Sequence, residues 1–359
     1  MTEVHVVLPA SVDDPRRPSC GNGYDRRVCD GLRSAGWRVR EHLVGGAWPW
    51  AAHEHRAALR DAVARVPDGG VVVVDGLLAS TSPEVLVPEA RRVRLVVLLH
   101  MLVEDAPAPA SSGDGRALER AVLTSASAVV TTSRATAERA RLTHGLDESL
   151  VPVHVAVPGV APADVAPGST SGTRLLTVGA VTPLKGHDLL IDPLCRASRV
   201  EWTVVGSLET DPDFVASLRS RVDGRGLADR VRMLGPLVGV DLDRAYADAD
   251  LVVVPSRSEA YGMVVTEALA RGIPVLAADV GGIREALGRT GSGRVPGLLF
   301  PPDDADALAR ALVQWLDDAG LRDDLRDAAL ERRGELAPWS STVARVADVL
   351  TDVAAQEAA

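Results

Sequence analysis

Residues 250–279 read DLVVVPSRSEAYGMVVTEALARGIPVLAAD, and this stretch is the strongest fold signal in the chain. Residues 251–256 and 273–279 are continuous apolar runs, which are typical of strands covered on both faces. Between them, residues 262–272 have helical spacing and end at Gly272, a residue type that commonly stops helices. Strand, helix and strand in this order predict a right-handed βαβ unit in a parallel sheet.

The same alternation extends over the chain on both sides of this stretch. Further apolar runs typical of buried strands lie at residues 4–9, 71–76, 94–100, 128–133, 174–180, 202–207 and 231–235. Helical spacing is found at residues 24–37, 82–92, 135–142 and 304–318. Because residues 157–173 are rich in Pro, Gly, Ser and Ala, they are interpreted as a linker between two series. We therefore predict an α/β fold with two doubly wound, Rossmann-like domains at residues 1–160 and 174–338, joined by residues 161–173.

Composition excludes several classes of protein. The net charge of −10 argues against a nucleic-acid partner, since phosphate binding needs a basic face. The three cysteines show no CxxC spacing, which argues against a disulfide framework or a zinc site and is consistent with a reducing cytoplasm. We find no signal peptide, and no apolar run reaches the ~18 residues of a membrane span. We therefore expect a cytoplasmic protein whose membrane contact is at most peripheral.

Two glutamates, Glu259 and Glu267, lie on either side of the predicted helix start, with seven residues between them. The backbone N–H groups of Tyr261, Gly262 and Met263 are expected to form an anion site at that start. Carboxylates bind hydroxyls rather than phosphates, so the pair suits a diphosphate flanked by two sugars, as in a sugar nucleotide. The alternative from spacing alone is a capping acid followed by a solvent-facing glutamate.

The stretch and its flanks resemble the family 4 retaining glycosyltransferases. Their signature, E-x7-E, a G-x-P-V strand and a glycine pair before an acid, is present as Glu259…Glu267, GIPVLAAD, Gly281-Gly282 and Glu285. Two further family motifs are matched by VGAVTPLKG at residues 178–186 and by LLFPPDDADALARAL at 298–312. The resemblance covers residues 174–320 in order. It is looser in the N-terminal half, at GNGYDRRVCDGLRSAGW and at LVVLLH, which ends at His100.

The resemblance implies a GT-B architecture, with two Rossmann-like domains that face a central cleft. Residues 1–160 correspond to the acceptor domain, residues 174–338 to the donor domain, and the last helix, within 339–359, crosses back to the N-terminal domain. The implied reaction moves a sugar from a nucleotide-diphosphate sugar to an acceptor hydroxyl or amine, with retention of anomeric configuration and without a metal. No cofactor is expected beyond a UDP- or GDP-linked donor.

The resemblance also assigns residues. Lys185 is expected to contact the donor diphosphate, where a cation can neutralise charge on the leaving group, and Glu267 to hold the ribose hydroxyls. The expected catalytic residues are His100, Lys185 and Glu259. The expected donor-binding residues are Gly21, Gly23, Gly179, Lys185, Gly206, Glu259, Tyr261, Gly262, Met263 and Glu267. The expected acceptor residues are Asn22, Tyr24, His100 and Glu104, and the acceptor is a sugar, a small molecule or a lipid-linked group.

The chain departs from the family pattern at Ala180 and Leu184, where many relatives carry an arginine. Arg257 or Arg284 is the predicted substitute. In the N-terminal half, residues 21–23 are predicted to form a tight turn that enters a helix at Tyr24 or Asp25.

Two other possibilities concern metal ions and the reaction itself. Asp248-Ala249-Asp250 and Asp241-Leu242-Asp243 match the D-x-D pattern of metal-dependent glycosyltransferases. They precede a strand and cap a helix, so no metal is expected there. A nucleotide-sugar epimerase and a non-catalytic GT-B partner subunit stay open as alternative functions, and the sequence leaves the nucleobase, sugar, acceptor and oligomeric state undetermined.

Overall fold

The computed structural model describes residues 2–107, 109, 113–147 and 149–355. The chain divides into two compact units. Residues 1–13, 20–159 and 339–359 make up the first unit, and residues 14–19 and 160–338 make up the second. Within the described residues, no helix combines the length and the apolar character that crossing a membrane requires.

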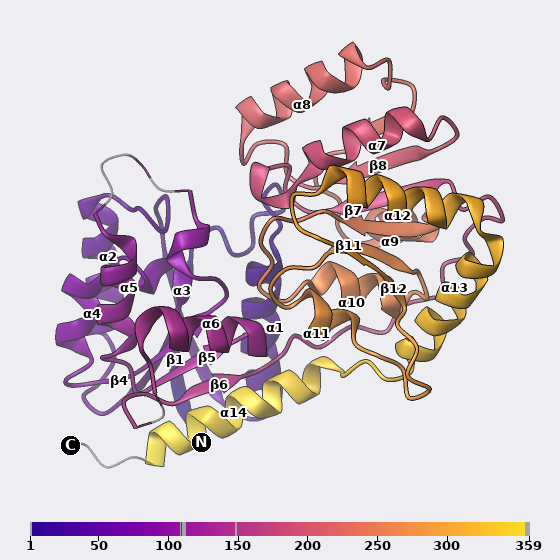
Figure 1. The fold of residues 1–359 in the computed structure, drawn as a ribbon. Helices are drawn as coiled ribbons and strands as arrows, with labels where there is room; N and C mark the ends of the chain where they lie inside the picture. The colour runs from indigo at the N-terminus through magenta and orange to yellow at the C-terminus, as the bar shows by residue number, and fades with distance from the viewer. Residues whose placement is uncertain (1, 108, 110–112, 148, 356–359) are drawn as a thin grey trace. The chain divides into compact units, whose positions relative to one another are not determined.

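The first unit is built on a six-stranded parallel sheet with the order β2-β1-β3-β4-β5-β6 (Figure 1). Its strands are β1 (Glu3–Pro9), β2 (Arg38–Val44), β3 (Val71–Asp75), β4 (Arg94–Leu99), β5 (Ala128–Thr131) and β6 (Val153–Val155). Its helices are α1 (Cys20–Ser34), α2 (His53–Ala64), α3 (Gly76–Ala79), α4 (Pro83–Glu89), η1 (Val103–Asp105), α5 (Gly115–Leu123), α6 (Arg134–His144) and α14 (Trp339–Ala355). The C-terminal helix α14 packs on α1 and thus belongs to this unit.

The second unit is also built on a six-stranded parallel sheet, with the order β12-β11-β10-β7-β8-β9. Its strands are β7 (Arg174–Val178), β8 (Glu201–Val205), β9 (Val231–Met233), β10 (Leu251–Val254), β11 (Val275–Ala278) and β12 (Gly297–Phe300). Its helices are η2 (Pro183–Lys185), η3 (His187–Leu190), α7 (Ile191–Arg196), α8 (Pro212–Gly224), α9 (Gly239–Ala247), α10 (Met263–Ala270), α11 (Ile283–Leu287), α12 (Ala305–Asp317) and α13 (Ala319–Arg333).

The predicted fold class, with two Rossmann-like doubly wound units, is confirmed. The strands that the sequence analysis did not single out include β2 and β6, which lie at the two edges of the first sheet. Most residues of β2 are exposed or only partly buried, and they include Arg38, Arg40 and Glu41, so this strand lacks the apolar run of a central strand. Residues 161–173 pack along the second unit, where Trp315 Nε1 donates a hydrogen bond to the Gly172 carbonyl at 2.7 Å.

The strand order of each sheet fixes where a ligand site is expected. In the first sheet the chain moves outward from β1 to β2 and then returns to the other side of β1 with β3. In the second sheet it moves from β7 to β8 and β9 and returns to the other side of β7 with β10. Open α/β sheets bind ligands at the carboxyl ends of the strands next to such a reversal. The ends of β7 and β10 and the ends of β1 and β3 are therefore the positions to inspect.

Candidate active site

The carboxyl ends of β7 and β10 bring Lys185, Ser256 and Glu259 together, and we call this group the Lys185 cluster. Lys185 Nζ donates a hydrogen bond to Glu259 Oε2 at 2.6 Å, and Ser256 Oγ donates to the same oxygen at 3.1 Å. The side chain of Lys185 is 26% exposed and that of Glu259 10%, so the ion pair is partly shielded from water. A cation and a carboxylate thus lie side by side at the reversal point of the second sheet.

The position of Lys185 follows from the local backbone after β7. Gly179 leaves the strand with φ 152°, and the chain then closes the single turn η2, which ends at Lys185. Gly206, at the end of β8, lies so close that a Cβ there would be 1.9 Å from the Gly179 carbonyl oxygen. Because the two strand ends approach each other so closely, only glycine fits at position 206. The close approach explains Gly206 and the φ of 152° explains Gly179, without requiring either glycine to contact a nucleotide.

Arg257 braces the turn that carries Lys185. Its guanidinium makes two hydrogen bonds to the Asp188 carboxylate, at 2.9 and 3.0 Å, and one to the Pro183 carbonyl at 2.5 Å. Its backbone N–H donates to the Leu184 carbonyl at 2.8 Å. The Asp188 contact raises the pKa of Arg257, so the group is a firmly held cation beside η2. Arg284, the other predicted substitute, is 71% exposed and pairs with Asp279.

Glu259 is held by the glycine pair that follows β11. Gly282 N–H donates to the Glu259 carbonyl at 3.1 Å. Gly281 has φ 48°, and a Cβ at that position would lie 1.8 Å from the same carbonyl oxygen. The pair therefore allows two backbone segments to touch, which is a structural reason for this motif.

Helix α10 begins at Met263, with Gly262 as its N-cap in the left-handed region (φ 98°). Tyr261, Gly262 and Met263 thus lie at the helix start as predicted. Glu267 lies on the second turn and is partly buried. Its Oε2 accepts a hydrogen bond from the Tyr246 hydroxyl at 2.8 Å. Tyr246 is fully buried, so it fixes one oxygen of Glu267 in place.

A second group lies in the first unit, and we call it the His100 cluster: His100, Asp25 and Asp75. His100 follows β4, Asp75 ends the neighbouring strand β3, and Asp25 comes from α1. His100 Nε2 lies 2.7 Å from Asp25 Oδ1 and 3.7 Å from Asp75 Oδ2. The His100 side chain is 14% exposed, whereas those of Asp25 and Asp75 are 0% and 2% exposed.

Burial dominates the electrostatics of the His100 cluster. It raises the pKa of Asp25 to about 7 and raises that of Asp75 well above its usual range, where the neighbouring Asp25 charge adds to the effect. Burial also lowers the pKa of His100, and the charge of Asp75 opposes that shift. These pKa shifts favour a neutral imidazole. They also favour one retained proton on the pair of carboxyls beside it.

Two predictions about the glycine segment of the first unit are wrong. Helix α1 begins at Cys20, so Gly21, Asn22 and Gly23 lie in its first turn and do not form a tight turn before it. Tyr24 is fully buried, and its hydroxyl donates to the Ala156 carbonyl at 2.8 Å. Its ring packs edge-on against the rings of His100 and Trp339, so Tyr24 is a core residue and is not accessible to an acceptor.

The remaining acceptor-side residues have protein partners. Asn22 Nδ2 donates to the Ser11 carbonyl at 3.2 Å, and Gly21 lies against the His100 ring. Glu104 Oε1 accepts from Arg139 at 2.6 Å, and Arg139 also holds Asp105. The loop after His100 is thus tied to α6 by one arginine. Whether these residues touch an acceptor stays a prediction.

The D-x-D acids have other uses in the fold. Asp250 is 3% exposed and accepts hydrogen bonds from Ser169 Oγ at 2.8 Å and Arg174 N–H at 3.0 Å. Asp241 pairs with Arg244 at 3.0 Å, and Asp243 pairs with Arg271. Asp248 and Asp250 lie at the amino end of β10, and Asp241 and Asp243 lie in the first half of α9. That these acids hold no metal stays a prediction.

Sequence reasoning missed the partners that hold the predicted residues. Asp75 was detectable, since it ends the strand VVVVD and strands β3 and β4 are neighbours in a parallel sheet. Asp25 on α1 and Tyr246 on α9 gave no local signal. Their contacts join residues 75 and 21 positions apart, and only the packing of helices on the sheets creates them.

Comparisons with known proteins test the resemblance. Residues 168–332 match the family Glycosyl transferases group 1. D-inositol 3-phosphate glycosyltransferase 1 of Catenulispora acidiphila is 32% identical over 290 residues, which cover 73% of this chain and 67% of that protein. The chain belongs to the group 1 glycosyltransferases. The predicted resemblance to the family 4 enzymes is thereby confirmed as a family relationship.

Other relatives match this chain over a smaller share of their own length. D-inositol 3-phosphate glycosyltransferase of Jonesia denitrificans is 34% identical over 212 residues, which span 53% of this chain and 49% of that protein. The chain thus spans about half the length of several curated relatives.

Solved structures support the fold of the group 1 glycosyltransferase chain. Sucrose-phosphate synthase from Thermosynechococcus elongatus has a TM-score of 0.80 at 22% identity, over 98% of this chain and 99% of that one. Anabaena HepE, solved in complex with UDP-glucose, has a TM-score of 0.74 at 20% identity, over 98% of this chain and 100% of that one. At these identities the likeness concerns the GT-B fold alone.

Proposed function

We propose that this chain transfers a sugar from a nucleotide-diphosphate sugar to an acceptor hydroxyl or amine, with retention of anomeric configuration and without a metal ion. The observation that carries the proposal is the Lys185 cluster at the reversal point of the second sheet, in a chain of the group 1 family. Lys185 contacts the diphosphate, and the start of α10, with its N–H groups and helix dipole, provides the second anion contact.

Each carboxylate of the motif has a role beside the diphosphate. Glu267, whose Oε2 accepts a hydrogen bond from Tyr246, binds the ribose hydroxyls. Glu259 stays close to Lys185 and contacts the donor sugar. The leaving phosphate accepts the proton of the attacking hydroxyl on the same face, which gives retention without a covalent enzyme intermediate. His100, in the first unit, contributes a hydrogen bond to a sugar or acceptor hydroxyl.

The donor is a UDP- or GDP-linked sugar. UDP is the first nucleotide to test because Anabaena HepE was solved with UDP and with UDP-glucose. D-inositol 3-phosphate is the first acceptor to test because several relatives carry it in their names. Other sugars, small molecules and lipid-linked groups are the wider acceptor class, and membrane contact is at most peripheral.

A paired titration and product assay tests the proposal. Isothermal titration with UDP, GDP and their sugars measures donor binding, and proton NMR of the product measures the anomeric configuration. We expect binding of one nucleoside diphosphate and transfer with retention. Conversion of the donor without an acceptor would identify an epimerase, and an absence of nucleotide binding would favour a non-catalytic partner subunit.

Replacing Lys185 tests the residue that carries the proposal. In Lys185→Ala we expect turnover to fall by more than donor affinity, because charge grows on the leaving diphosphate only in the transition state. Steady-state kinetics and titration of the same preparation measure the two losses. Arg225→Ala is the matched control, since this exposed cation at the C-terminus of α8 pairs with Asp192 outside the cluster. Equal losses in turnover and affinity would assign Lys185 to ground-state binding.

A further inference from the structure

The His100 cluster places two carboxyl groups against one imidazole nitrogen in the interior of the first unit. Asp25 Oδ1 is 2.7 Å from His100 Nε2, a hydrogen-bond distance, whereas Asp75 Oδ2 is 3.7 Å from it. Asp75 Oδ1 accepts the backbone N–H of Leu77 at 2.6 Å, as the N-cap of α3. Asp25 is therefore the group that binds His100 directly.

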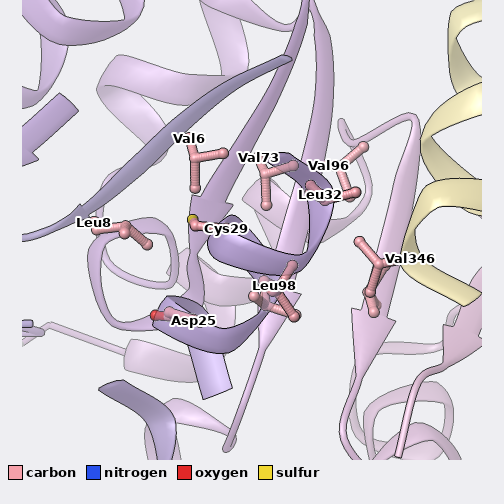
Figure 2. A pocket seen from close by; sticks show the side chains of 11 residues that line it. Val6, Leu8, Asp25, Cys29, Leu32, Val73, Val96, Leu98 and Val346 are labelled. Carbon is pink, nitrogen blue, oxygen red and sulfur yellow. The ribbon is translucent and has the colours of Figure 1, made fainter. Parts of the chain in front are cut away.

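One oxygen of Asp25 lacks a donor in the described part of the chain. Asp25 Oδ2 is buried and accepts no hydrogen bond from the described residues. A cavity of about 10 Å³ adjoins Asp25, and Figure 2 displays the side chains that line it. Of its lining residues only Asp25 and Cys29 carry polar side-chain atoms. A water there would lack the two to four polar partners that a buried water needs, so hydration does not satisfy this oxygen.

A proton on the carboxyl pair provides the missing donor. Two adjacent buried carboxyls do not both ionise, because each charge disfavours the other and both lose their hydration. Asp75 is the better proton carrier, since it lies 3.7 Å from the imidazole nitrogen, whereas Asp25 lies within hydrogen-bond distance of it. A protonated Asp75 donates to Asp25, and Asp25 stays the carboxylate.

A metal ion is the competing occupant, because these three residues offer ligand atoms within 4.8 Å of one another. Metal–ligand bonds of ~2.1 Å at tetrahedral or octahedral angles would separate the nitrogen and oxygen by roughly 3.0–3.4 Å. The 2.7 Å between His100 Nε2 and Asp25 Oδ1 is a hydrogen-bond distance.

We propose that Asp25 is a positioning residue that binds the Nε2–H of His100 and keeps Nδ1 unprotonated, while Asp75 carries the proton that the two carboxyls share. His100 then presents a hydrogen-bond acceptor to a hydroxyl proton, and its ring cannot turn without losing the contact with Asp25. The identity of that hydroxyl, on the donor sugar or on the acceptor, rests on the function proposed above.

Nitrogen-15 NMR of the imidazole tests the tautomer without any assay of activity. The chain has 8 histidines, and the spectrum of His100→Ala assigns the His100 signals by their loss. We expect a neutral ring protonated at Nε2 in the wild type at pH 8, and the same state in Asp75→Asn, which copies a protonated acid. In Asp25→Asn we expect a mixture of tautomers. A ring protonated at Nδ1 in the wild type, or shifts moved by added Zn²⁺ or Mg²⁺, would overturn the proposal.

Kinetics of the same two variants separate positioning from a structural role. Asp25→Asn should lower kcat roughly 10- to 100-fold, the loss of one hydrogen bond to a charged group, with donor KM nearly unchanged. The kcat of Asp75→Asn should fall far less than that of Asp25→Asn. The melting temperature of Asp25→Asn should not fall, because a costly buried charge is removed. Equal kcat losses in the two variants, or a kcat loss that follows a lower melting temperature, would contradict the assignment.

The dependence of the rate on pH distinguishes a positioning role of Asp25 from a purely structural one, because a purely structural role would leave the pH dependence unchanged. The charged and titratable groups that face Asp25 are Tyr24, Arg26 and Cys29 on α1, together with Asp75 and His100. Wild-type activity should fall as pH drops below about 7, as the cluster gains a proton. In Asp25→Asn this limb should move to lower pH, since no carboxylate stabilises the imidazolium, and an unmoved limb would contradict the proposal.

Failure of this inference and failure of the proposed function are distinguishable. If the wild type transfers sugar and Asp25→Asn does so equally well, the positioning role is wrong and the transferase function stands. If the wild type transfers no sugar, the imidazole spectra still report whether Asp25 binds Nε2–H.

Discussion

Glu267 has a partner that its place on the helix does not reveal. Its Oε2 accepts the hydroxyl of the buried Tyr246, and Arg271 lies over the face of the Tyr246 ring at 4.3 Å. The carboxylate is thus held in one orientation before any ligand binds. Pre-organisation of this kind lowers the entropic cost of binding hydroxyls.

Replacing Glu267 should weaken binding of the nucleoside diphosphate. A hydrogen bond to a charged group is worth roughly 1.5–3 kcal/mol, so in Glu267→Gln we expect the dissociation constant to rise about tenfold or more. Tyr246→Phe should give a smaller rise, because the carboxylate remains but is no longer held. Titration with UDP measures both, with Glu201→Gln at the amino end of β8 as control. Unchanged affinity in Glu267→Gln would mean that Glu267 does not contact the ribose.

Removing the imidazole should affect transfer and spare nucleotide binding. His100 lies in the first unit, whereas the Lys185 cluster lies in the second. In His100→Ala we expect the transfer rate to fall by roughly 10²-fold, the low end for a positioned acid–base group. Nucleoside diphosphate affinity should stay the same. Initial rates with donor and acceptor, beside a titration, are the measurement, and near-wild-type rates would restrict His100 to a structural role.

The buried carboxyl of Asp25 makes a prediction about stability. Its pKa is about 7 in the folded chain and ~3.9 when unfolded, so the folded state binds the extra proton between these values. Its stabilising effect is present below pH ~4 and is lost as pH rises through about 7. The melting temperature of Asp25→Asn minus that of the wild type should therefore grow from pH 5 to pH 8. A difference that shrinks over this range would contradict the assigned shift.

At the scale of elements, the loop after β4 depends on one buried glutamate. Glu119, on α5, is fully buried and accepts from Ser80 Oγ at 2.7 Å and from the Val103 N–H at 2.9 Å. Its Oε2 lies 2.8 Å from Nε2 of His144, the last residue of α6. Helices α5 and α6 and the 3-10 turn η1 are thereby joined at one carboxylate. The hydrogen bond from the Val103 N–H to Glu119 thus anchors the segment that follows His100.

Neutralising Glu119 should destabilise the first unit. In Glu119→Gln an amide faces donor groups in the interior, and breaking one partner of a buried network costs about 3–5 kcal/mol. Urea denaturation followed by circular dichroism measures the loss. Glu138→Gln on the exposed face of α6 should change stability by less than about 0.5 kcal/mol. Similar midpoints for the two variants would show that the network contributes little.

At the scale of the whole molecule, the proposed reaction needs no metal ion. In the proposed mechanism Lys185 and the start of α10 supply positive charge at the leaving group. Asp250 accepts hydrogen bonds from Ser169 and from the Arg174 N–H, and Asp241 pairs with Arg244. We expect initial rates to be unchanged after EDTA treatment. Lost activity that Mg²⁺ or Mn²⁺ restores would revive a metal-dependent mechanism.

The sequence by itself determined the fold class and singled out Lys185, Glu259 and Glu267 as the candidate site residues of the second unit. Continuous apolar runs mark central strands, since both faces of such strands are buried, and glycines mark places where backbones touch, as Gly206 and Gly281 do. Both signals are local. The edge strands β2 and β6 were missed because a strand with one neighbour is only half covered.

Only the tertiary structure decided what holds the site residues. The contacts of His100 with Asp25, of Glu267 with Tyr246 and of Glu119 with His144 join residues from different elements. It also placed Tyr24 in the core, although its neighbours in the chain are polar. Such pairs depend on how helices pack over parallel sheets. The chain order of the elements does not encode those distances, whereas the periodicity of each element is written in its own residues.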